Sequence, residues 1–232
     1  MRLKGFISDL DGTLLNTLPV CCNGFRRAFA VFLGREYSDP EIQSWFGPSE
    51  EGIIKQMVPH AWEECLALYL QEYERGHEAC AEPFPGLKSV LAAMREQGVR
   101  LGIVSGKGPQ SMAISLAVSG LRDFFAEVAT GSESGVVKTD QIGAMVRAWG
   151  VDPAEVAYLG DTAYDMRAAR AAGVIPLAAA WADTAQLQEL TDAAPVAVFK
   201  TVAEFRAWLE NHGGLGHAPD SPSNSESASL TR

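Results

Sequence analysis

The sequence predicts an α/β protein whose core is a Rossmann-like parallel sheet, with an α-helical cap domain inserted into that core. Two observations lead to this fold class. Short apolar runs alternate with stretches that carry apolar residues at helical spacing, a pattern typical of parallel sheets covered on both faces. Between residues 17 and 83 the alternation stops, and only helical patterns remain.

The predicted strands are short apolar runs, and several of them end in polar residues or glycine. The first is KGFISDL near the N-terminus, and the others are expected within residues 99–106, 124–131, 156–161, 174–181 and 194–199. Helices are expected at residues 87–98, 140–150 and 163–173, each ending on a glycine. In such sheets ligands bind outside the carboxyl ends of the strands. We therefore expect the functional residues directly after the strands.

The segment 17–83 is too long for an ordinary connection, so we expect it to form a helical cap over the strand ends. PFPG at 83–86 would return the chain to the core, which then comprises residues 1–16 and 84–212. Residues 213–232 are rich in Gly, Pro and Ser and are predicted to be a disordered tail.

The composition sets limits on partners and location. The chain has 232 residues, of which 47% are hydrophobic and 21% charged, as in soluble globular proteins. A formal net charge of -10 argues against a nucleic-acid partner. No segment approaches the roughly 18 apolar residues of a membrane span. The four cysteines lack zinc spacing and the N-terminus lacks a signal-peptide pattern. We therefore expect a cytoplasmic protein without membrane or nucleic-acid partners.

Asp9 and Asp11 follow the first predicted strand and are the leading candidates for catalysis. Gly12 allows a sharp turn that can bring both carboxylates toward one pocket. One carboxylate can then attack phosphorus, while the other protonates the leaving oxygen and activates water. The alternative is a turn in which these aspartates only cap the backbone.

Asp161 and Asp165 form a second pair of carboxylates, at a strand end and in the first turn of the next predicted helix. Two carboxylates close together favour a cation between them, and hard oxygen ligands suit Mg²⁺. The alternative is that both simply stabilise the N-terminus of the helix.

Two further segments could bind a phosphoryl group. The Ser105 hydroxyl and the Gly106 N–H group follow a predicted strand and could hold an anion, although an ordinary turn explains them equally well. Lys138 could neutralise the carboxylates and the phosphoryl oxygens, or could lie on the surface.

The order of these pieces resembles the haloacid dehalogenase-like hydrolase superfamily, and DLDGTLLNT and GDTAYDMRAARAAGV resemble its phosphoglycolate phosphatase-like branch. The resemblance implies an Mg²⁺-dependent phosphatase with an aspartyl-phosphate intermediate. The roles that it implies are nucleophile and metal ligand for Asp9, acid/base and metal ligand for Asp11, phosphate binding for Ser105 and Gly106, charge stabilisation for Lys138, and metal binding for Asp161 and Asp165.

Two departures from the family pattern leave the substrate open. Ser105, Gly106 and Lys107 stand where relatives commonly have Thr-Asn-Lys, and the prolines that usually follow the lysine at position 138 are missing. Lys107 is a second candidate for the role of Lys138.

The expected substrate is a small phosphorylated metabolite, such as phosphoglycolate or a sugar or nucleotide phosphate. In the cap, the resemblance points to Gly47 and Trp45 as substrate contacts, with Phe46 as an alternative to Trp45, unless this is a plain loop whose two aromatic residues pack in the core. Arg26 and Arg27 could bind a second anionic group of the substrate or could be solvated residues of a helix surface. A phosphomutase of the same superfamily and a non-catalytic binding protein stay open as alternatives, and the sequence does not predict the oligomeric state.

Overall fold

The computed structural model describes residues 2–77, 80–213 and 215. Among these residues, parallel strands form one six-stranded sheet in the order β3-β2-β1-β4-β5-β6. The strands are β1 (Gly5–Ser8), β2 (Arg100–Val104), β3 (Glu127–Ala129), β4 (Val156–Gly160), β5 (Ile175–Ala179) and β6 (Ala197–Phe199). The predicted α/β fold is confirmed, and each strand lies within the segment predicted for it.

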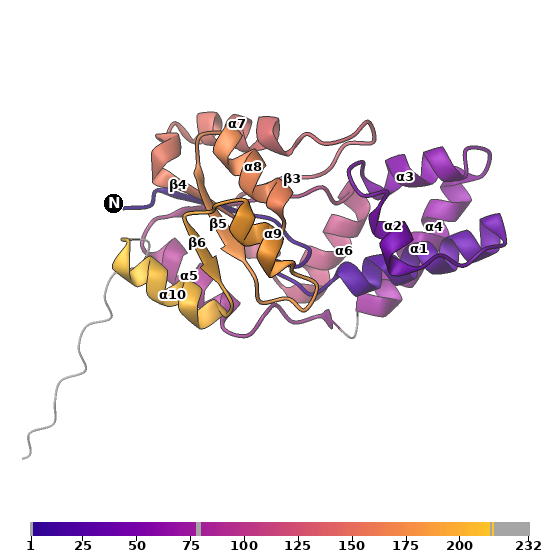
Figure 1. The fold of residues 1–232 in the computed structure, drawn as a ribbon, viewed down its shortest axis with the longest axis horizontal. Helices are drawn as coiled ribbons and strands as arrows, with labels where there is room; N and C mark the ends of the chain where they lie inside the picture. The colour runs from indigo at the N-terminus through magenta and orange to yellow at the C-terminus, as the bar shows by residue number, and fades with distance from the viewer. Residues whose placement is uncertain (1, 78–79, 214, 216–232) are drawn as a thin grey trace, which may run out of the picture.

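Helices cover both faces of the sheet (Figure 1). One face packs against α7 (Lys138–Trp149) and α8 (Ala163–Ala171), and the other against α5 (Leu87–Glu96), α6 (Pro109–Ser119) and α10 (Val202–Asn211). Helix α9 (Leu187–Asp192) packs on α8 and β5. Successive side chains of β1 divide between the faces, because Phe6 belongs to the apolar cluster of α5 and α10 and Ile7 to that of α7 and α8.

The sequence patterns do not predict helix α6, which packs on the sheet next to the inserted segment. Its buried residues include Ser111, Ser115 and Ser119, spaced four apart, in addition to Met112 and Leu116. A helix face that buries hydroxyl groups escapes a search for apolar residues at helical spacing. This polar face suits the position of α6, which lies against α4 of the inserted segment.

The inserted segment forms helices α1 (Leu18–Leu33), α2 (Asp39–Gln43), α3 (Glu50–Met57) and α4 (Trp62–His77). They share an apolar cluster of their own, which includes Phe25, Phe29, Tyr69 and Tyr73, and they lie as a group beside the sheet (Figure 1). We interpret them as the predicted cap of residues 17–83, on a core of residues 1–16 and 84–212. Most of the predicted tail, residues 213–232, lies outside the described residues.

Backbone hydrogen bonds also lie where the cap meets the core. Where the chain leaves and re-enters the core, the Phe84 N–H group donates to the Leu14 carbonyl at 3.2 Å. At the start of α3, the Ser49 N–H group donates to the Ser132 carbonyl at 2.9 Å. Gly52 follows on α3, and a Cβ atom there would lie only 2.4 Å from the Glu133 carbonyl oxygen. The start of α3 therefore approaches the core closely through its backbone.

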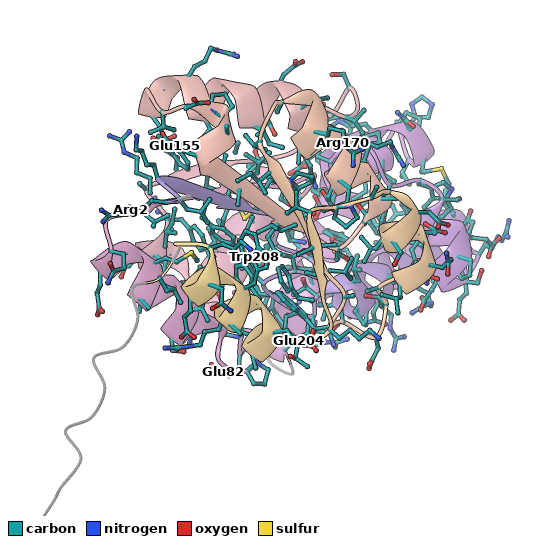
Figure 2. All side chains as sticks on the ribbon, turned by 60° about the vertical axis from the view of Figure 1, so that its left-hand side comes forward. Arg2, Glu82, Glu155, Arg170, Glu204 and Trp208 are labelled. Atoms are coloured by element: carbon teal, nitrogen blue, oxygen red, sulfur yellow. The ribbon has the colours of Figure 1, made fainter. Side chains whose placement is uncertain are left out.

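Charged side chains lie on the outer surface of the molecule. Figure 2 shows charged side chains such as Arg2, Glu155 and Glu204 at its rim, and none of the three is buried. Within the described part of the chain, no helix has the length and hydrophobicity that a membrane span requires.

Replacing Gly52 by alanine should weaken the packing of α3 on the core. The added methyl group meets the backbone of Glu133, which cannot move aside as a flexible side chain can. We expect the free energy of unfolding in urea to fall by about 1–3 kcal/mol. Gly143→Ala in α7 is the control, because its added Cβ meets only the mobile end of Arg147, and it should gain up to about 1 kcal/mol of helix propensity. Equal effects of the two changes would contradict this close contact.

Candidate active site

The candidate site lies at the carboxyl ends of β1, β2 and β4. Strand β1 stands between β2 and β4 in the sheet, so the chain changes the direction of strand addition there, and ligands bind at such points in parallel sheets. Asp9 follows β1, Ser105 follows β2 and Asp161 follows β4. All three line one cavity of about 430 Å³ between these strand ends and the cap.

Asp9 is buried and held by two donors. Its Oδ1 accepts a hydrogen bond from the Leu10 N–H group at 2.7 Å, and its Oδ2 accepts one from Lys138 Nζ at 2.8 Å. Burial raises the pKa of Asp9, Lys138 lowers it, and the nearby Asp165 carboxylate raises it again, so that this pKa lies above its ordinary value. The carboxylate is thus fixed at the cavity wall and depends on nearby positive charge to stay ionised.

The turn after β1 lies directly against Asp161. Gly12 has a φ of +74°, and a Cβ atom there would lie 2.1 Å from Asp161 Oδ2. Only glycine fits both this backbone conformation and this close approach. The Thr13 hydroxyl from the same turn donates to Asp161 Oδ1 at 3.1 Å. The sequence DGT therefore shapes the pocket as well as supplying Asp11.

Asp165 lies behind the cavity wall and is fully buried. Its Oδ2 accepts hydrogen bonds from the Thr162 N–H group at 3.1 Å and the Thr162 hydroxyl at 2.6 Å, in a capping box at the start of α8. Its Oδ1 accepts one from Lys138 Nζ at 2.6 Å. Asp165 thus caps the helix and also holds Lys138 beside Asp9, while its binding of a metal stays a prediction.

These carboxylates suit a divalent cation. Asp9, Asp161 and Asp165 each offer an oxygen, and the three oxygens lie within 4.8 Å of one another. Burial, followed by the charges of Asp165 and Asp9, raises the pKa of Asp161 well above its ordinary value. The excess of buried negative charge over the single ammonium of Lys138, and the hard oxygen ligands, fit Mg²⁺.

Asp11 also lines the cavity, but its carboxylate belongs to a different set of contacts. Its Oδ1 accepts hydrogen bonds from the Thr17 hydroxyl, at the start of α1, and from Lys107 Nζ at 3.2 Å. The two lysines named in the sequence analysis are thus divided between the two aspartates. Lys138 contacts Asp9, and Lys107 contacts Asp11.

Ser105 and Gly106 lie at the cavity as the strand pattern predicts. Ser105 is buried, and its hydroxyl accepts a hydrogen bond from the Lys107 N–H group at 3.3 Å. Gly106 is exposed and approaches Gly131 so closely that a Cβ on Gly131 would lie 1.9 Å from the Gly106 carbonyl oxygen. The segment is a tight turn that borders the cavity beside Asp9.

Glu50 is a site residue that the sequence analysis missed. It opens α3 in the cap, is only 6% exposed, and lines the cavity. Its carboxylate accepts hydrogen bonds from the Gly108 N–H group, from the Ser111 hydroxyl at 2.7 Å and from Lys107 Nζ at 3.4 Å. The serines of α6, spaced four apart, were the sequence signal of a buried polar face that could have indicated such a partner.

The structure separates the candidate residues of the cap. Gly47 and Phe46 line the cavity. Trp45 packs instead in the cap core, with ring centroids 5.5 Å from Phe29 and 5.0 Å from Tyr37, and it does not line the cavity, which argues against a contact with the substrate. Arg26 and Arg27 do not line the cavity either. Arg26 pairs with Asp39 and Arg27 is exposed.

Comparison with known proteins agrees with this geometry. A family model described as haloacid dehalogenase-like hydrolase matches residues 6–179. A phosphoglycolate phosphatase of Synechococcus elongatus is 30% identical over 77% of this chain and 84% of its own, and a pyrophosphatase PpaX of Halalkalibacterium halodurans is 27% identical over 75% and 82%. The structure of CbbY from Rhodobacter sphaeroides in complex with phosphate superposes with a TM-score of 0.72 at 17% identity, covering 88% of this chain and 96% of that one, which shows the shared fold.

The raised pKa of Asp161 predicts how a divalent cation stabilises the protein. A carboxyl group whose pKa is raised by folding stabilises the cation-free protein at low pH, and this contribution is lost as the pH rises through the folded-state pKa. A cation replaces the proton, so Mg²⁺ should raise Tm more at about pH 8 than at about pH 5. At about 100 times its Kd the gain approaches about 2.7 kcal/mol.

Thermal unfolding with Mg²⁺ or with EDTA at both pH values measures this effect. Asp161→Asn is the control and should lose most of the difference, because the amide neither titrates nor carries charge. A shift of Tm that is the same at both pH values would contradict the metal site.

Proposed function

Because the chain belongs to the haloacid dehalogenase-like hydrolase family, we propose that it is a magnesium-dependent phosphatase that cleaves a phosphate monoester through an aspartyl-phosphate on Asp9. One observation carries this proposal. The carboxylate of Asp9 lies at the wall of the cavity, where it is fixed by Lys138 and the Leu10 N–H group, and Asp11 lines the same cavity. A nucleophile and an acid thus border one space that a phosphate ester can enter.

Asp9 acts as the nucleophile in this proposal. Its oxygen attacks phosphorus in line with the bond to the leaving group, and the ester oxygen departs on the opposite side. Lys138 keeps Asp9 ionised and neutralises part of the charge on the phosphoryl group. The pKa of the Lys138 ammonium supports this role, since burial lowers it but Asp165 and Asp9 raise it well above its ordinary value. Lys138 therefore stays charged throughout.

Asp11 acts as the general acid and then as the general base. It starts protonated, gives this proton to the departing oxygen and becomes a carboxylate, and then takes a proton from the water that cleaves the aspartyl-phosphate, which restores its protonated form. Thr17 and Lys107 hold its carboxylate at the side of the cavity nearer the cap. The proton is thus delivered from the side where the leaving group lies.

Ser105 and Gly106 bind the oxygens of the phosphoryl group through the hydroxyl and the backbone N–H group. Asp9, Asp161 and Asp165, together with the backbone carbonyl of Asp11, would hold Mg²⁺. When bound, the ion supplies positive charge that lets the Asp9 carboxylate approach a phosphate dianion.

Loss of Asp9 should abolish phosphate release. Asp9→Asn keeps the size of the side chain but removes the nucleophilic charge, so we expect turnover of para-nitrophenyl phosphate with Mg²⁺ to fall by a factor of about 10⁴ or more. Asp183→Asn, which changes an exposed aspartate outside the cavity, should retain activity.

Phosphate release is the readout because it also separates hydrolysis from the alternatives. A phosphomutase would interconvert isomers of a sugar phosphate, and a binding protein would bind Mg²⁺ without turnover of any ester. Full Mg²⁺-dependent turnover by Asp9→Asn would rule out Asp9 as the nucleophile.

A further inference from the structure

We propose that the substrate is a phosphate monoester of an uncharged and largely apolar alcohol, and that Glu50 of the cap excludes substrates with a second anionic group. This inference rests on the proposed phosphatase function and names the substrate class of the same site. It follows from where the positive charges and hydrogen-bond donors of the cavity are already used.

The donors that could bind a second anion converge at the start of α6. The Gly108 N–H group, the Ser111 hydroxyl and the Lys107 ammonium point to one place, and together they have the chemistry of an anion site. The Glu50 carboxylate occupies that place and accepts a hydrogen bond from each of them. Tyr69 adds a fourth donor through its hydroxyl at 3.3 Å. The chain therefore fills this anion site with a carboxylate of its own.

This arrangement is buried and fully paired. The side chain of Lys107 is 0% exposed, Ser111 is 1% exposed and Glu50 is 6% exposed. Burial alone would lower the pKa of Lys107, but its anionic neighbours, Asp11 foremost, raise this pKa well above its ordinary value. Lys107 is therefore charged, and both Asp11 and Glu50 neutralise it. A substrate carboxylate could reach it only by displacing Glu50.

The charge balance of the cavity also argues against a second anionic group on the substrate. The lining includes four carboxylates, from Asp9, Asp11, Glu50 and Asp161, and two ammonium groups, from Lys107 and Lys138. Lys138 is paired with Asp9 and Asp165, and Lys107 with Asp11 and Glu50. A phosphoryl group adds negative charge that a bound Mg²⁺ would offset, so the excess of carboxylates over ammonium groups remains. A second anion on the substrate would meet no uncompensated cation among the described lining residues.

The part of the cavity that faces the leaving group is apolar. The cap and the loop opposite it contribute the side chains of Leu18, Phe25, Phe46, Ile53 and Val136. Cys21 lies among them, and burial raises the pKa of its thiol to about 12, so it is neutral. The cations of the cap lie elsewhere, since Lys55 pairs with Glu133 at 2.6 Å. Such a wall favours an apolar alcohol over a charged one.

This class differs from what the names of two relatives suggest. Phosphoglycolate carries a carboxylate two atoms from the ester oxygen, and pyrophosphate carries a second phosphoryl group. The relatives named phosphoglycolate phosphatase and pyrophosphatase share about a quarter to a third of their residues with this chain over the matched regions. That similarity supports common chemistry at phosphorus, and the cap residues decide what the phosphoryl group is attached to.

Matched pairs of esters test the proposal. Within each pair a carboxylate is exchanged for an amide of the same shape, and in the benzyl pair this group is far enough from phosphorus to leave its reactivity unchanged. The pairs are 4-carboxybenzyl and 4-carbamoylbenzyl phosphate, and phosphoglycolate and its amide. We expect kcat/KM for the neutral member of each pair to be higher by a factor of about 10 or more.

Glu50→Gln tests the residue itself. The amide preserves the shape, and its oxygen can still accept the hydrogen bonds from Ser111, Lys107 and Tyr69. Its NH2 group cannot accept the one from Gly108, and the negative charge beside Lys107 is removed. The preference for the neutral member should fall by a factor of about 10, mostly through a lower KM for the charged member. Glu64→Gln, an exposed carboxylate of α4, is the matched control and should leave the preference unchanged.

A second variant covers the case in which Glu50→Gln does not fold. Phe46 is 40% exposed at the cavity, and its ring contacts Phe25 at a centroid distance of 6.5 Å. Phe46→Arg gives up this contact but introduces a cation, and it should improve kcat/KM for the charged members. A wild-type preference for the charged members, or an unchanged preference in Glu50→Gln, would overturn the proposal while the phosphatase function stands. Absence of turnover for every ester would instead refute the phosphatase function.

Discussion

The ammonium group of Lys138 is the contact on which the rest of the site depends. It lies 2.8 Å from Asp9 Oδ2 and 2.6 Å from Asp165 Oδ1, and so joins the end of β1 to the start of α8. Buried carboxylates this close repel each other unless a cation lies between them. Because Lys138 also opens α7, the same ion pairs fix the position of that helix relative to the sheet. The geometry around Asp9 and the packing of one face of the core are therefore a single arrangement.

Much of this arrangement could be predicted from the sequence, because it follows from strand ends. Asp9, Ser105 and Asp161 each come directly after an apolar run, and parallel strands bring such positions to one edge. The pair of Glu50 and Lys107 could not be predicted in the same way. The two residues are 57 positions apart and meet only because the cap docks on α6. An acidic residue at a helix N-terminus otherwise indicates no more than a favourable dipole contact.

The sequence also could not predict which of two adjacent aromatic residues faces the cavity. Trp45 and Phe46 are both large aromatic residues in one short connection, and composition does not distinguish them. The structure does, because Trp45 fills a gap between Phe29 and Tyr37 while Phe46 borders the cavity. Which of two neighbouring side chains faces a ligand depends on the direction of the chain after α2, and this direction depends on packing across the whole cap.

The contacts of Lys107 connect specificity with catalysis. Its ammonium contacts Asp11, the proposed acid, at 3.2 Å, and Glu50, from the cap, at 3.4 Å. The acid is therefore held by a cation whose second partner arrives with the cap. A pocket can select a ligand by attracting the correct one or by penalising the wrong one. In our proposal Glu50 acts in the second way, since it completes the environment of Lys107 and opposes a second anion. The residues that tie the cap to the core would then also determine which leaving groups can reach Asp11.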